Sequence, residues 1–232
     1  MKLISIVLGQ AVRLFKAPDP IGGTFLPDLV AAIKERYGFL KVPTSIQDFD
    51  VTKGISFEHG KFHVHPRSLP DGNVYKEIVI ESFQIFNDGL VVGTKAFAED
   101  ADLFLDDFIQ WAQSTFRATI LESIPIQYAY NSQVEVTFPK PWISLFDKIS
   151  PLNEQITNAL ISYGSIVPPY YQMAGFSLHC DLTSMAPPRP GAFTFERRAG
   201  QPYSSNLYFS AAPLKTSDHL NALEEIERLA SK

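Results

Sequence analysis

Residues 55–65, ISFEHGKFHVH, carry the most informative local pattern in the chain. Apolar and polar residues alternate on both sides of His59-Gly60, a dipeptide that suits a tight turn between two strands. If these two residues form the turn, Phe57 and Phe62 become partners on one face of a two-stranded ribbon. The segment therefore predicts a β-hairpin within an antiparallel sheet.

The rest of the chain shows alternating patterns for further strands and helical spacing for about four helices. The predicted strands cover residues 3–15, 75–97 (a hairpin with its turn at 87–89), 125–138, 171–183, 192–198 and 205–211. The predicted helices cover residues 27–37, 99–116, 141–163 and a last segment that starts near 216. Strands in runs between single helices predict an α+β fold, mainly antiparallel sheet built from long hairpins and packed by about four helices.

We expect a single compact domain over residues 1–232, with two packed halves, 1–117 and 125–232, as a possible subdivision. Each half contains several strands followed by a helix, and no sequence repeat indicates a duplication. The strand over residues 3–15 is apolar on both faces, which predicts a central strand covered on both sides.

The composition excludes several classes of protein. The 232 residues include 20 basic and 25 acidic side chains, a formal charge of -5. General nucleic-acid binding is therefore not expected, because attraction to phosphates needs an excess of Lys and Arg. No apolar stretch approaches the roughly 20 residues that span a membrane. The one cysteine, Cys180, forms no disulfide within the chain, and we expect a reducing, cytoplasmic location.

A first candidate site is the His63/His65 pair. Alternate residues of a strand point to the same face, so both imidazoles could reach one metal ion. Glu58, opposite Lys61 in the hairpin register, would lie close to them. Two histidines fall short of the three or four ligands of a usual site, so the solvated face of a hairpin is the competing interpretation.

A second candidate site is the polar cluster formed by Glu196, Arg197 and Arg198, with Tyr203 close behind in the sequence. Strand alternation places Glu196 and Arg198 on one face and Arg197 on the other. One arginine is expected to pair with a carboxylate, while the other could receive an anionic ligand or a partner. A structural ion pair beside a turn is the alternative interpretation.

Three acids, Glu99, Asp102 and Asp106, share one face of the helix predicted over 99–116. Carboxylates in such a group can bind Mg²⁺. The favourable interaction of acids with a helix N-terminus also explains them, so the pattern alone does not predict a metal site.

The sequence contains no complete catalytic set, no phosphate-binding loop and no dinucleotide-binding glycine pattern. We therefore expect neither a catalytic centre nor a cofactor, and we expect a non-enzymatic interaction or scaffold protein. Low charge and many aromatic residues favour self-association into a homo-oligomer or binding to a protein partner. The alternatives are a metal-assisted hydrolase that uses His63 and His65, and a module that binds a small anion through Arg197 and Arg198.

Overall fold

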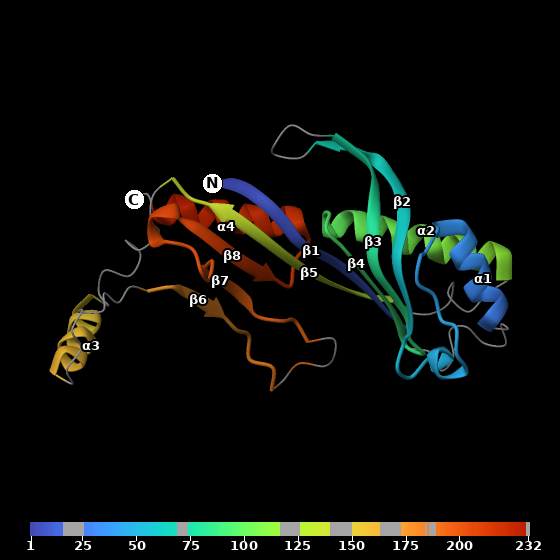
Figure 1. Cartoon of the computed structure of the whole chain (residues 1–232), viewed down its shortest axis with the longest axis horizontal. Helices are drawn as coiled ribbons and strands as arrows, with labels where there is room; N and C mark the ends of the chain where they lie inside the picture. The colour runs from blue at the N-terminus through green and yellow to red at the C-terminus, as the bar shows by residue number, and fades with distance from the viewer. Residues whose placement is uncertain are drawn as a thin grey trace.

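The structure is a computed structural model that describes residues 1–15, 26–68, 74–116, 126–139, 150–162, 173–183, 185 and 189–230. These residues form one eight-stranded antiparallel sheet and four α-helices, which confirms the predicted α+β class (Figure 1). The strands are β1 (Lys2–Phe15), β2 (Ile55–Ser68), β3 (Val74–Ile85), β4 (Gly89–Thr94), β5 (Ile126–Thr137), β6 (Gly175–Leu178), β7 (Phe193–Arg197) and β8 (Leu207–Ala212). The helices are α1 (Leu26–Tyr37), α2 (Ala98–Phe116), α3 (Ser150–Ser162) and α4 (Thr216–Ala230).

The two halves of the chain repeat one order of elements. A strand and a helix, β1 and α1, precede three strands and the helix α2; β5 and α3 precede three further strands and α4. The strand order in the sheet is β2-β3-β4-β1-β5-β8-β7-β6. Each strand of the first half has a counterpart at the same distance from the opposite edge: β2 and β6, β3 and β7, β4 and β8, β1 and β5. A single sheet therefore runs through both halves, and its topology has a pseudo-twofold axis between β1 and β5.

Strand register confirms this relation residue by residue. The β1–β4 ladder starts at the Gly9–Thr94 pair and continues for six residue pairs along β1. The β5–β8 ladder starts at the Ser132–Ala212 pair and likewise continues for six pairs along β5. Gly9 and Ser132 also pair with each other between β1 and β5, so the pseudo-twofold axis passes through this pair.

Helices α2 and α4 begin at equivalent positions and meet at the axis. α2 starts at Ala98 and α4 at Thr216, each at the same interval after the start of its ladder. The backbone N–H of Ala98 donates to Thr216 Oγ1 at 2.9 Å, and the backbone N–H of Ser217 donates to Glu99 Oε1 at 3.0 Å. Each helix start thus accepts a hydrogen bond from an N–H that the other helix leaves unpaired.

Gly9 permits this close approach. A Cβ at this position would lie 2.2 Å from the carbonyl oxygen of Ala96 and 2.7 Å from the backbone nitrogen of Ala98. Both distances are far below van der Waals contact, so only glycine fits beneath the start of α2.

The core lies between the sheet and the helices on one of its faces. The larger buried cluster joins α1 and α2 to β1–β4 and is rich in contacts between aromatic rings, among them Phe57 stacked on Phe83 at 5.7 Å between centroids. The smaller cluster joins α4 to β1, β5, β7 and β8. The prediction that β1 is central is confirmed. Among the described residues the expected cover on both faces is not found, because α1, α2 and α4 all pack on the same side of the sheet.

The predicted hairpin over residues 55–65 is wrong. These residues belong to one continuous strand, β2, which pairs along its length with β3. His59 has the positive φ of 57° that a turn would need, but it produces an irregularity within the strand. Beyond His59, buried and exposed residues alternate again. Phe57 and Phe62 therefore both face the core from the same strand and are not cross-strand partners.

The other predicted strands and helices have counterparts in the structure where it describes them, but the strand predicted over 171–183 is wrong in extent: only β6, Gly175–Leu178, forms, and residues 179–183 are not in a strand. The turn at 87–89 connects β3 to β4, with the N–H of Phe86 donating to the carbonyl oxygen of Gly89 at 2.8 Å. The proposed boundary at 117–124 and the first part of the helix predicted over 141–163 lie outside the described residues.

Candidate functional site

The predicted cluster at the end of β7 separates onto the two faces of the sheet. Arg197 lies on the helix-covered face, where its Cζ is 4.3 Å from the centre of the Tyr203 ring. Its Nη1 donates to the carbonyl oxygen of Tyr203 at 2.8 Å. The ring of Tyr208 lies 5.4 Å away. Arg197 Nε is buried and has no hydrogen-bond partner among the described residues.

Arg198 lies on the other face and forms the ion pair that the sequence suggested as one alternative. Its Nε is 2.8 Å from Glu135 Oε1, and Ser5 Oγ donates to the second oxygen of Glu135 at 2.9 Å. The guanidinium also lies 5.7 Å from the centre of the Phe209 ring. Glu196 is exposed on β7. The four residues therefore stand near one another without forming one pocket.

The proposed metal ligands on β2 have separate neighbours. His63 is 83 % exposed, with Nε2 3.6 Å from Glu77 Oε2. Glu58 binds Lys41 Nζ at 2.5 Å instead of facing Lys61, and this hydrogen bond lowers the pKa of Glu58. His65 is exposed. Within the described part of the chain, no three His, Cys, Asp or Glu side chains are grouped so that they could hold a metal ion.

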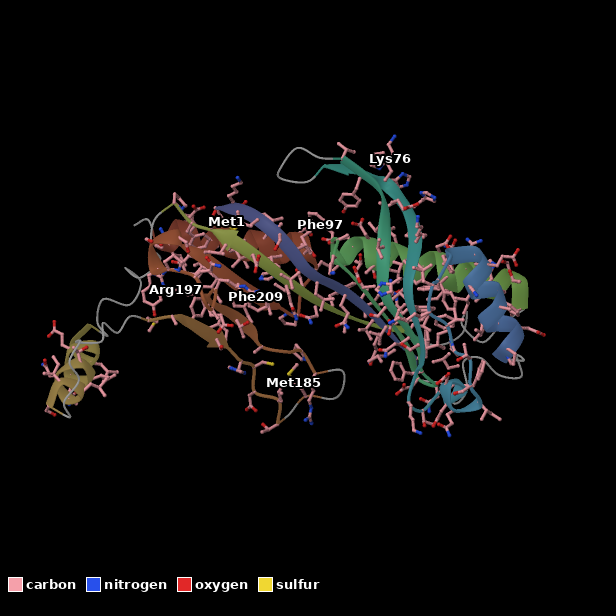
Figure 2. The ribbon with its side chains drawn as sticks, viewed as in Figure 1. Met1, Lys76, Phe97, Met185, Arg197 and Phe209 are labelled. Atoms are coloured by element: carbon pink, nitrogen blue, oxygen red, sulfur yellow. The ribbon has the colours of Figure 1, made fainter. Side chains whose placement is uncertain are left out.

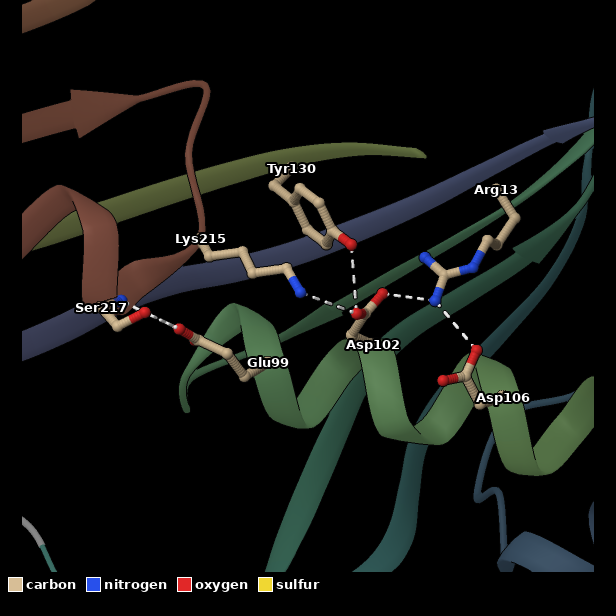
Figure 3. Close-up of polar contacts among 7 residues, drawn as sticks. All are labelled: Arg13, Glu99, Asp102, Asp106, Tyr130, Lys215 and Ser217. Atoms are coloured by element: carbon tan, nitrogen blue, oxygen red, sulfur yellow. Dashed lines mark hydrogen bonds and ion pairs between the residues drawn. The ribbon is translucent and has the colours of Figure 1, made fainter. Parts of the chain in front are cut away.

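A polar network centred on the buried guanidinium of Arg13 lies near the pseudo-twofold axis (Figure 3). Arg13 Nη2 pairs with Asp102 and, at 3.0 Å, with Asp106 Oδ1. Tyr130 donates its hydroxyl to Asp102 Oδ2 at 3.1 Å, and Lys215 Nζ lies 3.3 Å from the same oxygen. The carboxylate of Asp102 on α2 therefore links β1, β5 and Lys215, the residue before α4.

Charge and burial hold Arg13, Tyr130 and Lys215 in their protonated forms. Burial lowers the pKa of Arg13, but the hydrogen bonds and charges of Asp106 and Asp102 outweigh it and raise that pKa overall. For Tyr130, burial first and then the charge of Asp102 raise the pKa, so the phenol stays a donor. Burial lowers the pKa of Lys215, and the charge of Asp102 outweighs that effect and raises it. The arrangement suits a structural junction, because one carboxylate is shared by a guanidinium, an ammonium and a phenol from separate elements.

The sequence showed only part of this network. The acidic helix face was visible as Glu99, Asp102 and Asp106. Arg13 and Lys215, their cationic partners, are distant in sequence and carried no local signal. An unpaired run of acids beside a central strand that contains one arginine is the signal that could have suggested the pairing.

His219 forms a second buried polar group that the sequence did not reveal. Its ring is fully buried, with Nε2 2.8 Å from Ser210 Oγ and Nδ1 3.2 Å from Ser132 Oγ. Ser210 Oγ donates to the carbonyl oxygen of Thr194 at 2.6 Å, so Ser210 accepts from His219 Nε2–H. A serine nucleophile would need the opposite polarity, with its proton directed to the imidazole. This histidine therefore joins β5, β8 and α4.

Protonation of His219 should destabilise the fold. Burial lowers the pKa of His219 to about 4, whereas an unfolded histidine titrates near 6.5. Below pH 6.5 the unfolded chain therefore binds a proton that the native state does not. We expect the free energy of unfolding to fall by about 1.4 kcal/mol per pH unit as the pH drops from about 6.5 toward 4.

Urea denaturation at pH 7.5, 6.0 and 5.0 measures this loss, with His219→Gln and His63→Gln as a matched pair. The loss between pH 7.5 and 5.0 should be smaller in His219→Gln and unchanged in His63→Gln, whose ring is exposed. An identical pH dependence in all three proteins would contradict the assignment.

The face of the sheet opposite the helices forms a broad surface, which we call the open face. A Cβ on Gly93 would lie 3.4 Å from Leu8 Cδ1, and one on Gly89 would lie 3.0 Å from Leu14 Cδ2, so alternate residues of β1 and β4 share it. Its central, partly exposed side chains are Leu8, Gln10, Val12, Leu14, Val91, Asn131, Gln133, Leu207 and Phe209. Aliphatic, aromatic and amide groups therefore occupy its centre.

Charged groups on this face are paired with one another. Lys61 on β2 pairs with Glu77 on β3, and Lys41, from the segment before β2, pairs with Glu58. On the other half Arg198 pairs with Glu135, which lies on β5 opposite Phe209. A face with mainly uncharged side chains and paired charges suits a protein–protein interface.

Comparisons of the chain with protein-family models, with curated proteins and with solved structures found no match. Among the described residues, no helix has both the length and the apolar character needed to cross a membrane.

Proposed function

We propose that this protein is a non-enzymatic interaction protein that self-associates by packing the open face against the open face of a second copy. The observation that supports the proposal is the contrast between the two faces of one sheet. The helices cover one face, while the other presents a low-charge surface with aliphatic and amide side chains at its centre.

The extent of the open face suits a stable dimer. β1 has 14 residues, β5 has 12, and β4 and β8 have six each. With strands about 4.8 Å apart and residues about 3.4 Å apart, these four central strands cover on the order of 600 Å². Parts of β3 and β7 extend the surface toward the roughly 800 Å² per partner of a standard interface.

The chemistry of the open face also favours a second sheet as its partner. Two sheets that pack face to face interdigitate aliphatic side chains, about 10 Å apart, and keep polar groups at their margins. Val12 lies at the centre of such a contact, between Val91 on β4 and Ala129 on β5. Gln10 and Gln133 lie at equivalent positions on either side of the pseudo-twofold axis and supply amides on both halves.

Light scattering after size exclusion tests the proposal with Val12→Lys and a matched control, Leu103→Lys. Leu103 is 42 % exposed on α2, away from the open face. Wild type and Leu103→Lys should be dimers, whereas Val12→Lys should dissociate at least tenfold more readily, because a lysine there would be desolvated. Equal dimer stability in all three proteins would contradict the open face as the interface.

The two alternative functions stay hypotheses with tests of their own. Metal-assisted hydrolysis through His63, His65 and Glu58 requires that a divalent metal raise Tm in wild type and not in His63→Ala. Anion binding at Arg197 and Arg198 requires that phosphate or a nucleotide raise Tm. The structure offers neither a three-ligand cluster among the described residues nor two free guanidinium groups, so the interaction function is preferred.

A further inference from the structure

Helix α3 lies apart from the sheet, and the side chains drawn around it are its own (Figures 1 and 2). Leu152, Ile156 and Leu160 follow one another at helical spacing and form an apolar stripe. Leu152 is 53 % exposed, and Ile156 and Leu160 are partly exposed. A partly exposed apolar stripe on a helix can pack against a further surface.

The pseudo-twofold relation gives α3 a counterpart, α1, which is packed. The same shift in residue number that takes Gly9 to Ser132 takes Leu29 to Leu152 and Ile33 to Ile156. Leu29 therefore follows Gly9 by as many residues as Leu152 follows Ser132. Leu29 is 4 % exposed and Ile33 is fully buried.

The contacts of α1 identify the equivalent surface for α3. The Tyr37 ring packs on the ring of Phe104 in α2 at 4.8 Å between centroids and on that of Trp111 at 6.0 Å. The shift that relates the starts of α2 and α4 takes Phe104 to Ala222 and Trp111 to Leu229.

In the second half, this surface lacks such cover among the described residues. Leu229 of α4 is 42 % exposed, and Phe193 of β7 is only partly buried. No described residue of α3 belongs to the buried cluster of the second half.

We propose that α3 docks along α4, over β6 and β7, with Leu152, Ile156 and Leu160 turned toward the core. It then takes the place in the second half that α1 has in the first. The occupant is a segment of the same chain, because its apolar residues have the same spacing as those of α1 and lie at the same sequence interval from the Gly9–Ser132 pair. This inference does not depend on the open face, which is on the opposite side of the sheet.

Chemical cross-linking tests the docked position in a Cys180→Ser background. Leu160→Cys with Ala222→Cys places thiols at the counterparts of Tyr37 and Phe104, and a short bismaleimide should join them within one chain. Asn158→Cys with Ala222→Cys is the matched control, because Asn158 lies on the other side of the helix and should cross-link several-fold less.

Thermal unfolding supplies a second readout. Ile156→Ser should lower Tm by several degrees, because the side chain leaves an apolar contact, while Asn158→Ser should leave Tm unchanged. Efficient cross-linking within one chain together with the lower Tm supports docking. Equal cross-linking of the two pairs, a product that joins two chains, or an unchanged Tm in Ile156→Ser would each overturn it.

Discussion

Gly9→Ala should destabilise the protein by at least about 3 kcal/mol. The new Cβ would lie 2.2 Å from the carbonyl oxygen of Ala96, and neither that atom nor the nitrogen of Ala98 belongs to a side chain that can rotate away. Relief requires the start of α2 to move off β1, which also strains the hydrogen bond from Ala98 to Thr216. Chemical denaturation measures the change in the free energy of unfolding.

Gly191→Ala is the matched control, because nothing lies within 4 Å of a Cβ at that position. Its free energy of unfolding should stay within about 0.5 kcal/mol of wild type. If Gly9→Ala were equally mild, the close contact of α2 with β1 at the pseudo-twofold axis would be wrong.

Arg13→Met should cost about 3 kcal/mol of stability. Arg13 is 1 % exposed and is the buried cation between Asp102 and Asp106, so its loss leaves Asp102 without its closest positive partner. Lys215 still lies 3.3 Å from Asp102 and compensates part of the charge. Denaturation at pH 7.5 gives the value.

Lys53→Met is the control for a comparable ion pair at the surface. Lys53 is 79 % exposed and lies 3.3 Å from Asp50, so its loss should cost less than about 1 kcal/mol. The double variant Arg13→Met with Asp102→Asn should recover part of the loss, because it removes the unpaired charge. A double variant that is less stable than Arg13→Met would show that Asp102 acts through other contacts.

Local patterns predicted local structure well. Helical spacing over residues 27–37 predicted α1, and the turn at 87–89 predicted the β3–β4 connection. The same reasoning misplaced His59-Gly60, because a positive φ serves a strand irregularity as well as a turn. Which of the two forms depends on partners distant in sequence: β3 on one side and Lys41 on the other.

The sequence patterns did not predict which residues distant in sequence are paired or equivalent in the fold. The pseudo-twofold relation is visible in strand register, yet its paired positions hold different residues, such as Gly9 against Ser132 and Ala98 against Thr216. The same holds for the sites. The Arg198 ion pair was one of the predicted alternatives, whereas the surroundings of His219 come from β5, β7 and β8 and leave no motif.

The proposed self-association is tested most directly by native mass spectrometry of the untagged protein over a range of concentrations. The open-face account predicts a species with twice the mass of the 25.9 kDa chain and no added component. A single-chain mass at every concentration would contradict it. Extra mass that matches a metal or a small molecule would also contradict it, and would favour His63 and His65 or Arg197 and Arg198 as the functional residues.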